Sequence, residues 1–134
     1  GPSDERGRFG GCSRSREPLM LLAALEIPPG ASYVRTVRLL AANVARQSGY
    51  DEDSVDDIRL AVSEACLLHL GHDDPIEVRF SADDLGLTVE VGPNATPSAA
   101  EPDSQLAMTV LRAVAPRLEL TDGGLIMAWP TADA

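Results

Sequence analysis

The stretch that decides the fold is DSVDDIRLAVSEACLLHLGH, residues 53–72. Its apolar residues recur at intervals of three and four, the spacing of one face of an α-helix. Asp51 or Asp53 can cap the helix, further aspartates complement its dipole, and Gly71 is placed to end it. We therefore predict an amphipathic helix whose inner stripe consists of Ile58, Ala61, Val62, Ala65 and Leu68.

A second amphipathic helix is predicted immediately upstream, from Ser32 to about Ser48, where Gly49 ends it. Three arginines lie off its apolar face, at positions 35, 38 and 46. Helical spacing predicts that four residues face the core: Val34, Val37, Ala41 and Val44.

Apolar runs and alternation predict three strands around these helices. Residues 20–27 are apolar until Pro28-Pro29-Gly30 stops them, so we expect a strand there, with a buried helical turn as the competing interpretation. Residues 75–81 and 85–91 alternate and are separated by a turn at 82–84, which predicts a hairpin. Its inner face is expected to contain Ile76, Val78, Phe80, Leu85, Leu87, Val89 and Val91.

The last third of the chain adds a loop, a helix and another hairpin. Residues 92–104 are small and turn-forming, as in a flexible loop or lid. A third helix is predicted from Asp103 or Ser104 to Ala115, with Leu106, Val110, Leu111 and Val114 facing inward. A turn at Asp122-Gly123-Gly124 joins strands expected at 117–122 and 124–130.

The resulting order, β-α-α-β-β-α-β-β, predicts an α/β (α+β) fold. Three helices that each need one face covered, together with mainly antiparallel strands, imply a two-layer sandwich with the helices on the sheet. We assign one domain to residues 19–131. Residues 1–18 lack periodicity and are expected to be a disordered tail, in which Gly1-Pro2 resembles the scar of a removed purification tag.

Composition restricts the classes of partner. The chain has 21 acidic and 11 basic side chains, a formal net charge of −10, and 44% apolar residues. This charge argues against direct nucleic-acid binding and against an anionic membrane surface, whereas a basic protein partner fits it. No apolar run approaches the roughly 18 residues that a membrane span needs. Cys12 and Cys66 have no zinc-site spacing, and a buried, reduced Cys66 favours a cytoplasmic protein.

The element order and the motif DIRLAVSEAC, residues 57–66, resemble the anti-sigma factor serine kinases of the GHKL ATPase superfamily. The resemblance covers roughly residues 20–130 and implies a histidine-kinase-like ATPase fold. In that family the second helix has a Glu-x-x-x-Asn pair, in which the Glu is the general base and the Asn ligates the Mg²⁺ of Mg-ATP. Glu64 matches the Glu, but Leu68 stands at the Asn position and has no oxygen for a hard cation.

Three further family positions are changed. Pro93 stands where the family has the Asp that binds the adenine amino group. Gln105 and Ala107 stand where it has glycines that let backbone amides approach phosphate. The resemblance therefore implies a degenerate member without Mg-ATP as cofactor and without a metal, in which Glu64 is a relic of the catalyst.

The resemblance also implies partners: a sigma factor, an antagonist (anti-anti-sigma) protein, and a second copy in a homodimer. Leu60 and Leu67 are expected to pack against a neighbouring helix, with a partner surface as the alternative. His69 and His72, which matches a family histidine, are not expected to bind a metal together. The candidate partner-binding residues are Arg35, Arg38, Asp51, Asp53, Asp56 and Asp57.

The leading prediction is a non-enzymatic anti-sigma factor that sequesters a stress or developmental sigma factor until an antagonist displaces it. Two alternatives stay open. One is a small-ligand sensor that binds a nucleotide or metabolite in the vacated pocket. The other is a residual ATP-dependent serine kinase that acts on the anti-anti-sigma protein.

Overall fold

The computed structural model describes residues 19–70, 73–93 and 102–132. The predicted order of elements is confirmed. The elements are β1 (Met20–Ile27), α1 (Ala31–Gln47), α2 (Glu52–His69), β2 (Ile76–Asp83), β3 (Gly86–Gly92), α3 (Pro102–Val114), β4 (Arg117–Thr121) and β5 (Gly124–Pro130). The expected disordered tail, Gly71 and most of the expected lid lie outside the described residues.

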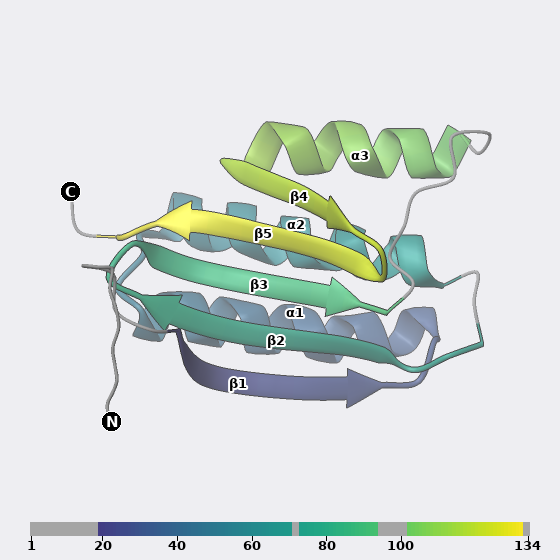
Figure 1. Ribbon diagram of the computed structural model, residues 1–134, viewed down its shortest axis with the longest axis horizontal. Coiled ribbons are helices and arrows are strands. Elements are labelled where there is room, and N and C mark those ends of the chain that lie inside the picture. The colour runs from purple at the N-terminus through teal and green to yellow at the C-terminus, as the bar shows by residue number, and fades with distance from the viewer. Residues whose placement is uncertain (1–18, 71–72, 94–101, 133–134) are drawn as a thin grey trace, which may run out of the picture.

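The strands form one sheet in the order β1-β2-β3-β5-β4, and each neighbouring pair is antiparallel. Residues 20–27 are therefore the expected strand and not a helical turn. β1 and β4 are the two edges of the sheet, as Figure 1 shows. Residues opposite each other in an antiparallel pair share a face, so this register fixes which side chains point toward the helices.

The helices cover one face of the sheet, and this confirms the predicted two-layer α/β sandwich. In Figure 1, α1 and α2 lie side by side behind the strands, and α3 follows at the β4 edge. One hydrophobic core fills the space between the two layers. It contains the inner residues predicted for α1, most of those predicted for α2, and those of the first hairpin except one. The fully covered members include Val37, Ile58, Ala61, Val62, Ala65, Ile76, Val78, Phe80 and Val89.

That exception is Leu85, which was predicted to face inward but has 58% of its surface exposed. The prediction was wrong because β2 continues to Asp83, which pairs with Gly86 across the hairpin. Leu85 thus lies in a two-residue loop. The Asp83 carboxylate fixes this loop by accepting hydrogen bonds from the backbone N–H groups of Leu85 at 2.8 Å and Gly86 at 3.2 Å.

Leu106 was also wrongly assigned to the core, since 64% of its surface is exposed. The inward face of α3 consists of Ser104, Ala107, Met108 and Leu111, of which only Leu111 was predicted to face inward. Val110 is half-buried, and Val114 is half-buried with packing against the core. α3 has apolar residues on more than one side, so its periodicity alone did not identify the side that packs.

Two smaller features of the helices bear on the site. α2 begins after Asp51, whose carboxylate accepts the backbone N–H of Ser54 at 2.8 Å, so the first of the two candidate caps is the one used. The Cys66 thiol is buried as predicted, and burial raises its pKa to about 12. Within the described residues, no helix is both long and apolar enough to cross a bilayer.

Matched substitutions on α2 test the assignment of its two sides. We expect Ile58→Ala to lower the free energy of unfolding by about 2–5 kcal/mol, because it leaves a cavity in a fully covered part of the core. Leu60→Ala, on the exposed side of the same helix, should change it by less than about 0.5 kcal/mol. Urea unfolding followed by circular dichroism measures both values. Equal losses in the two variants would contradict the assignment.

Candidate functional site

The candidate site begins on α2, where Glu64 and Leu68 lie one helical turn apart. The Glu64 side chain is half-buried, and this burial raises the pKa of its carboxyl. A carboxyl whose pKa is raised is better suited to accept a proton near neutral pH. Glu64 therefore keeps one property of a general base.

Leu68, the next residue on this side of α2, is half-buried and packs against the hydrophobic core. Its isobutyl group has no donor or acceptor atom. An aliphatic contact thus occupies the position at which the resemblance implies an oxygen ligand for Mg²⁺.

The end of β3 forms the second part of the site. Gly92 and Pro93 are joined by a cis peptide bond, and the Pro93 side chain is exposed. The backbone here runs against the β4–β5 turn: a methyl group added at Gly92 would come within 2.7 Å of the Gly123 carbonyl oxygen. Pro93 offers a carbonyl but no carboxylate or N–H group, so its side chain cannot hydrogen-bond an adenine amino group.

The first turns of α3 form the third part. Gln105 is exposed, and its backbone carbonyl accepts a hydrogen bond from the Thr109 hydroxyl at 2.9 Å. Ala107 is buried, with its methyl group on the inward side of the helix. Neither position has the bare backbone that a glycine would present to a phosphate group. The side chains at these positions therefore differ from those that the resemblance implies for Mg-ATP binding.

A second candidate region is the side of α1 and α2 that faces away from the sheet. We call it the α1–α2 outer face and define it by the exposed residues Arg35, Arg38, Leu39, Asp53, Asp57, Leu60 and Leu67. The short connection at residues 48–51 makes the two helices antiparallel. The predicted arginines on the first half of α1 and the predicted aspartates on the first half of α2 therefore lie at opposite ends of this face.

Two of the predicted partner-binding acids, and their neighbour Glu52, already have partners within the protein. Asp51 caps α2, and Asp56 accepts a hydrogen bond from Arg59 in an ion pair at 2.6 Å. Glu52 forms a two-point contact with Arg46, with both N–O distances at 3.0 Å. Of the predicted partner-binding aspartates, these contacts leave Asp53 and Asp57 without an ion pair to any described residue. The same holds for Arg35 and Arg38 on α1.

Exposed leucines connect the two charged ends. Leu60 and Leu67 have 42% and 41% of their surface exposed, so the expectation that they pack against a neighbouring helix was wrong. Leu39 on α1, 69% exposed, was not singled out from the sequence. Its position next to Arg38 and off the apolar stripe of α1 could have indicated from the sequence that it is exposed.

The two histidines are placed differently from each other. The His69 ring is fully buried at the end of α2, and His72 lies outside the described residues. Within the described part of the chain, no group of three His, Cys, Asp or Glu side chains lies close enough together to hold a metal ion.

The cap at Asp51 makes a prediction about acid stability. Hydrogen bonds from Ser54 lower the pKa of this carboxyl below its ordinary value of 3.8. A lowered folded-state pKa stabilises the fold above the ordinary pKa, and the stabilisation is lost as the pH falls through the folded-state value. Asp51→Asn, which still caps, should therefore match the parent protein at pH 2 and be less stable at pH 6. Urea unfolding between these values measures the difference, and a constant difference at all pH values would contradict it.

Comparison with known proteins agrees with the fold and with the element order around α2. The family profile described as Histidine kinase-like ATPase domain matches residues 27–126, which runs from the end of β1 into β5. The match includes every position of the candidate site.

Individual relatives match over a shorter stretch. The serine-protein kinase RsbW of Bacillus cereus (strain AH187) is 43% identical over 42 residues, which is 31% of this chain and 26% of the relative. Proteins of the same name from Bacillus thuringiensis (strain Al Hakam) and Bacillus anthracis (strain CDC 684 / NRRL 3495) match with the same identity and coverage. The aligned stretch thus spans about a quarter of the length of these relatives.

Proposed function

The chain belongs to the histidine kinase-like ATPase domain family, and from this premise we propose that it is a non-enzymatic anti-sigma factor. It binds and sequesters an alternative sigma factor and releases it when an antagonist protein competes for the same molecule. The observation that carries the proposal is the contrast on α2 between Leu68, which packs against the core, and Leu60 and Leu67, which are exposed.

The first support is chemical. Mg-ATP binding in this family rests on an amide oxygen, a carboxylate and exposed backbone amides. This chain has Leu68, Pro93 and the pair Gln105 and Ala107 at those positions. Each change removes a different kind of contact, so one substitution elsewhere does not compensate for all of them. We therefore propose that the protein acts without Mg-ATP and without phosphate transfer.

The second support is the α1–α2 outer face. Its aspartates without ion pairs, Asp53 and Asp57, attract a basic partner, as does the net charge of −10. The exposed leucines next to them supply apolar area that a partner can cover. Apolar contacts surrounded by charge are typical of protein interfaces, in which the charges mainly set specificity and the rate of association. DNA-binding helices of sigma factors are basic, and they fit this face.

Release must then follow mass action. Without phosphorylation of the antagonist, the fraction of free sigma factor depends on the concentrations and affinities of the three proteins. The antagonist therefore acts as a competitor or by binding the complex and weakening it.

Neutralising variants test this function. We expect the purified protein to form a stable complex with at least one alternative sigma factor on size exclusion. The double variant Asp53→Asn/Asp57→Asn should weaken that complex at least about tenfold, because the partner's cations lose their counter-charges. Glu77→Gln/Glu119→Gln, which removes two exposed charges from the sheet, is the matched control and should bind like the parent. Failure to bind throughout the sigma repertoire would refute the proposal.

Direct titration tests the absence of the enzyme. We expect no saturable heat when up to about 1 mM Mg-ATP is added in a calorimeter, since the ligating groups are missing. Because Glu64 keeps a raised pKa, a residual serine kinase is the specific competitor. Transfer of labelled phosphate to an antagonist protein that disappears in Glu64→Gln would establish that competitor instead.

A further inference from the structure

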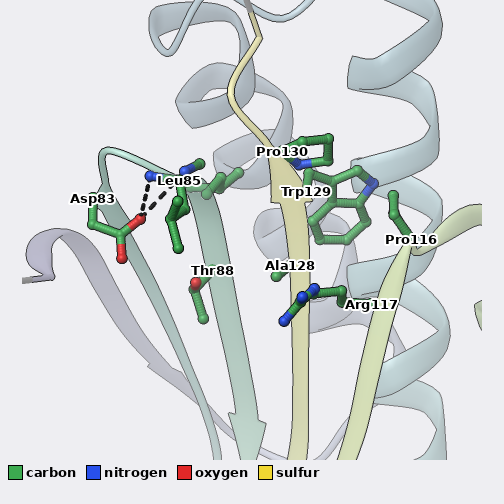
Figure 2. Close-up of a pocket in the computed structure, with 10 residues that line it drawn as sticks. Asp83, Leu85, Thr88, Pro116, Arg117, Ala128, Trp129 and Pro130 are labelled. Carbon is green, nitrogen blue, oxygen red and sulfur yellow. Dashed lines mark hydrogen bonds between the residues drawn. The ribbon is translucent and has the colours of Figure 1, made fainter. Parts of the chain in front are cut away.

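The face of the sheet opposite the helices contains a hollow that the proposed function does not use. Its volume is about 410 Å³, and it lies at the end of the sheet where the β2–β3 turn meets the last residues of β5 (Figure 2). Pockets that bind small molecules commonly measure about 300–1,000 Å³. The hollow therefore has the size of a small-ligand site.

The register of three strands forms its floor. Thr88 on β3 pairs with Ala128 on β5, which in turn pairs with Arg117 on β4. These side chains form one row on the open face, and the small Ala128 between two larger residues leaves the depression. Figure 2 shows the Arg117 side chain extending across β5 toward Thr88. A hydroxyl group and a guanidinium group thus border an apolar floor.

Arg117 supplies a permanent positive charge. Its guanidinium forms no ion pair or hydrogen bond with a described residue, although the chain as a whole has a net charge of −10. A guanidinium does not lose its proton in proteins, and it binds carboxylate and phosphate oxygens in a two-point geometry. The charged part of the ligand is therefore an anion.

Apart from Asp83, whose carboxylate accepts two backbone N–H groups of the β2–β3 turn, the remaining walls are apolar. Leu85 from the β2–β3 turn stands at one side, and Pro116 and Pro130 stand at the other (Figure 2). Leu85 is the residue that was predicted to face the core but is exposed. Its isobutyl group instead forms part of the wall of the hollow. Apolar walls with a few convergent polar groups are the usual composition of a small-molecule site.

Hydrogen bonds hold the Leu85 side of the hollow in place. Asp83 fixes the turn through the N–H groups of Leu85 and Gly86. Thr131, just after β5, donates its N–H to the Leu85 carbonyl at 3.0 Å and its hydroxyl to the Asp84 carbonyl at 3.0 Å. Gly86 has a φ of +141°, and a methyl group there would overlap the Trp129 carbonyl. The turn is thus tied to the end of β5 before any ligand arrives.

The opposite side is fixed in the same way. The Tyr50 hydroxyl, from the loop before α2, donates to the Pro130 carbonyl at 2.8 Å. The Trp129 indole N–H donates to the Val114 carbonyl at 3.2 Å, which anchors the tryptophan beside Pro116. A site whose walls are held in advance loses little conformational entropy when it binds.

We propose that this hollow binds a small organic anion with a compact apolar body. The carboxylate or phosphate of the ligand contacts the Arg117 guanidinium and accepts a hydrogen bond from the Thr88 hydroxyl. Its apolar body lies over Ala128 and against Leu85 and the two prolines. The site is on the face opposite the α1–α2 outer face, so it is independent of the partner surface.

Trp129 makes the proposal directly testable, because it is the only tryptophan of the chain and lines the hollow. We expect its fluorescence to change saturably when cyclohexanecarboxylate or cyclohexyl phosphate is added to the full chain. The neutral cyclohexylmethanol, at the same concentrations, should cause no saturable change, and the tighter of the two anions identifies the preferred head group. The amide signals of Thr88 and Ala128 should shift in parallel in NMR spectra.

Matched arginine variants assign the charge. Arg117→Gln should weaken anion binding at least about tenfold, whereas Arg112→Gln on the exposed side of α3 should leave it unchanged. Arg117→Lys keeps the charge but not the two-point geometry, so its affinity for the anion should lie between those of Arg117→Gln and Arg112→Gln. The absence of saturation by either anion up to about 50 mM would overturn the proposal. Equal binding by Arg117→Gln and the parent protein, or equal binding of the neutral alcohol, would overturn it too.

Discussion

The rest of the structure depends on the packing of α2 against the sheet and between its neighbouring helices α1 and α3. Ile58 and Val62 on this helix belong to the core between the helices and the sheet, and both side chains are fully covered. Each such aliphatic side chain contributes about 1.5–3 kcal/mol through burial. With aromatic residues at only 4% of the chain, the core depends on many aliphatic contacts and not on a few large rings.

Alanines make this arrangement possible. Ala41 and Ala45 on α1 and Ala61 and Ala65 on α2 are completely buried, and their small side chains let the helices approach each other and the sheet closely. The close approach uses only part of the circumference of α2. Leu68 is half-buried against the core, while Leu60 and Leu67 are exposed, so one helix provides both an aliphatic side chain where the resemblance implies a metal ligand and the exposed apolar residues. The proposed change from enzyme to binding protein thus needs no change of fold.

Sequence patterns predicted the element order and most of the inner face, because alternation and helical spacing report directly on which side is buried. They failed where an element has more apolar residues than its neighbours can cover. Leu106 and Leu60 are apolar on helices whose contact sides are elsewhere, and Leu85 lost its place in a strand because Asp83 extended β2 by two residues.

The features of the two sites also differ in whether the sequence could predict them. Missing chemical groups, such as the amide absent at Leu68, are visible in a sequence once its helix is located. The hollow on the open face is not, because Thr88, Ala128 and Arg117 come together only through the register of three strands. The pairing of Arg46 with Glu52 also depends on the turn geometry between two helices.

We propose that the fold binds its partner without help from a nucleotide. The most direct measurement is the dissociation constant of the complex with a sigma factor, determined with and without Mg-ATP at physiological concentration. We expect the same constant in both conditions, because a ligand that does not bind cannot shift the equilibrium. A complex that forms only with Mg-ATP, or that tightens tenfold in its presence, would contradict this proposal.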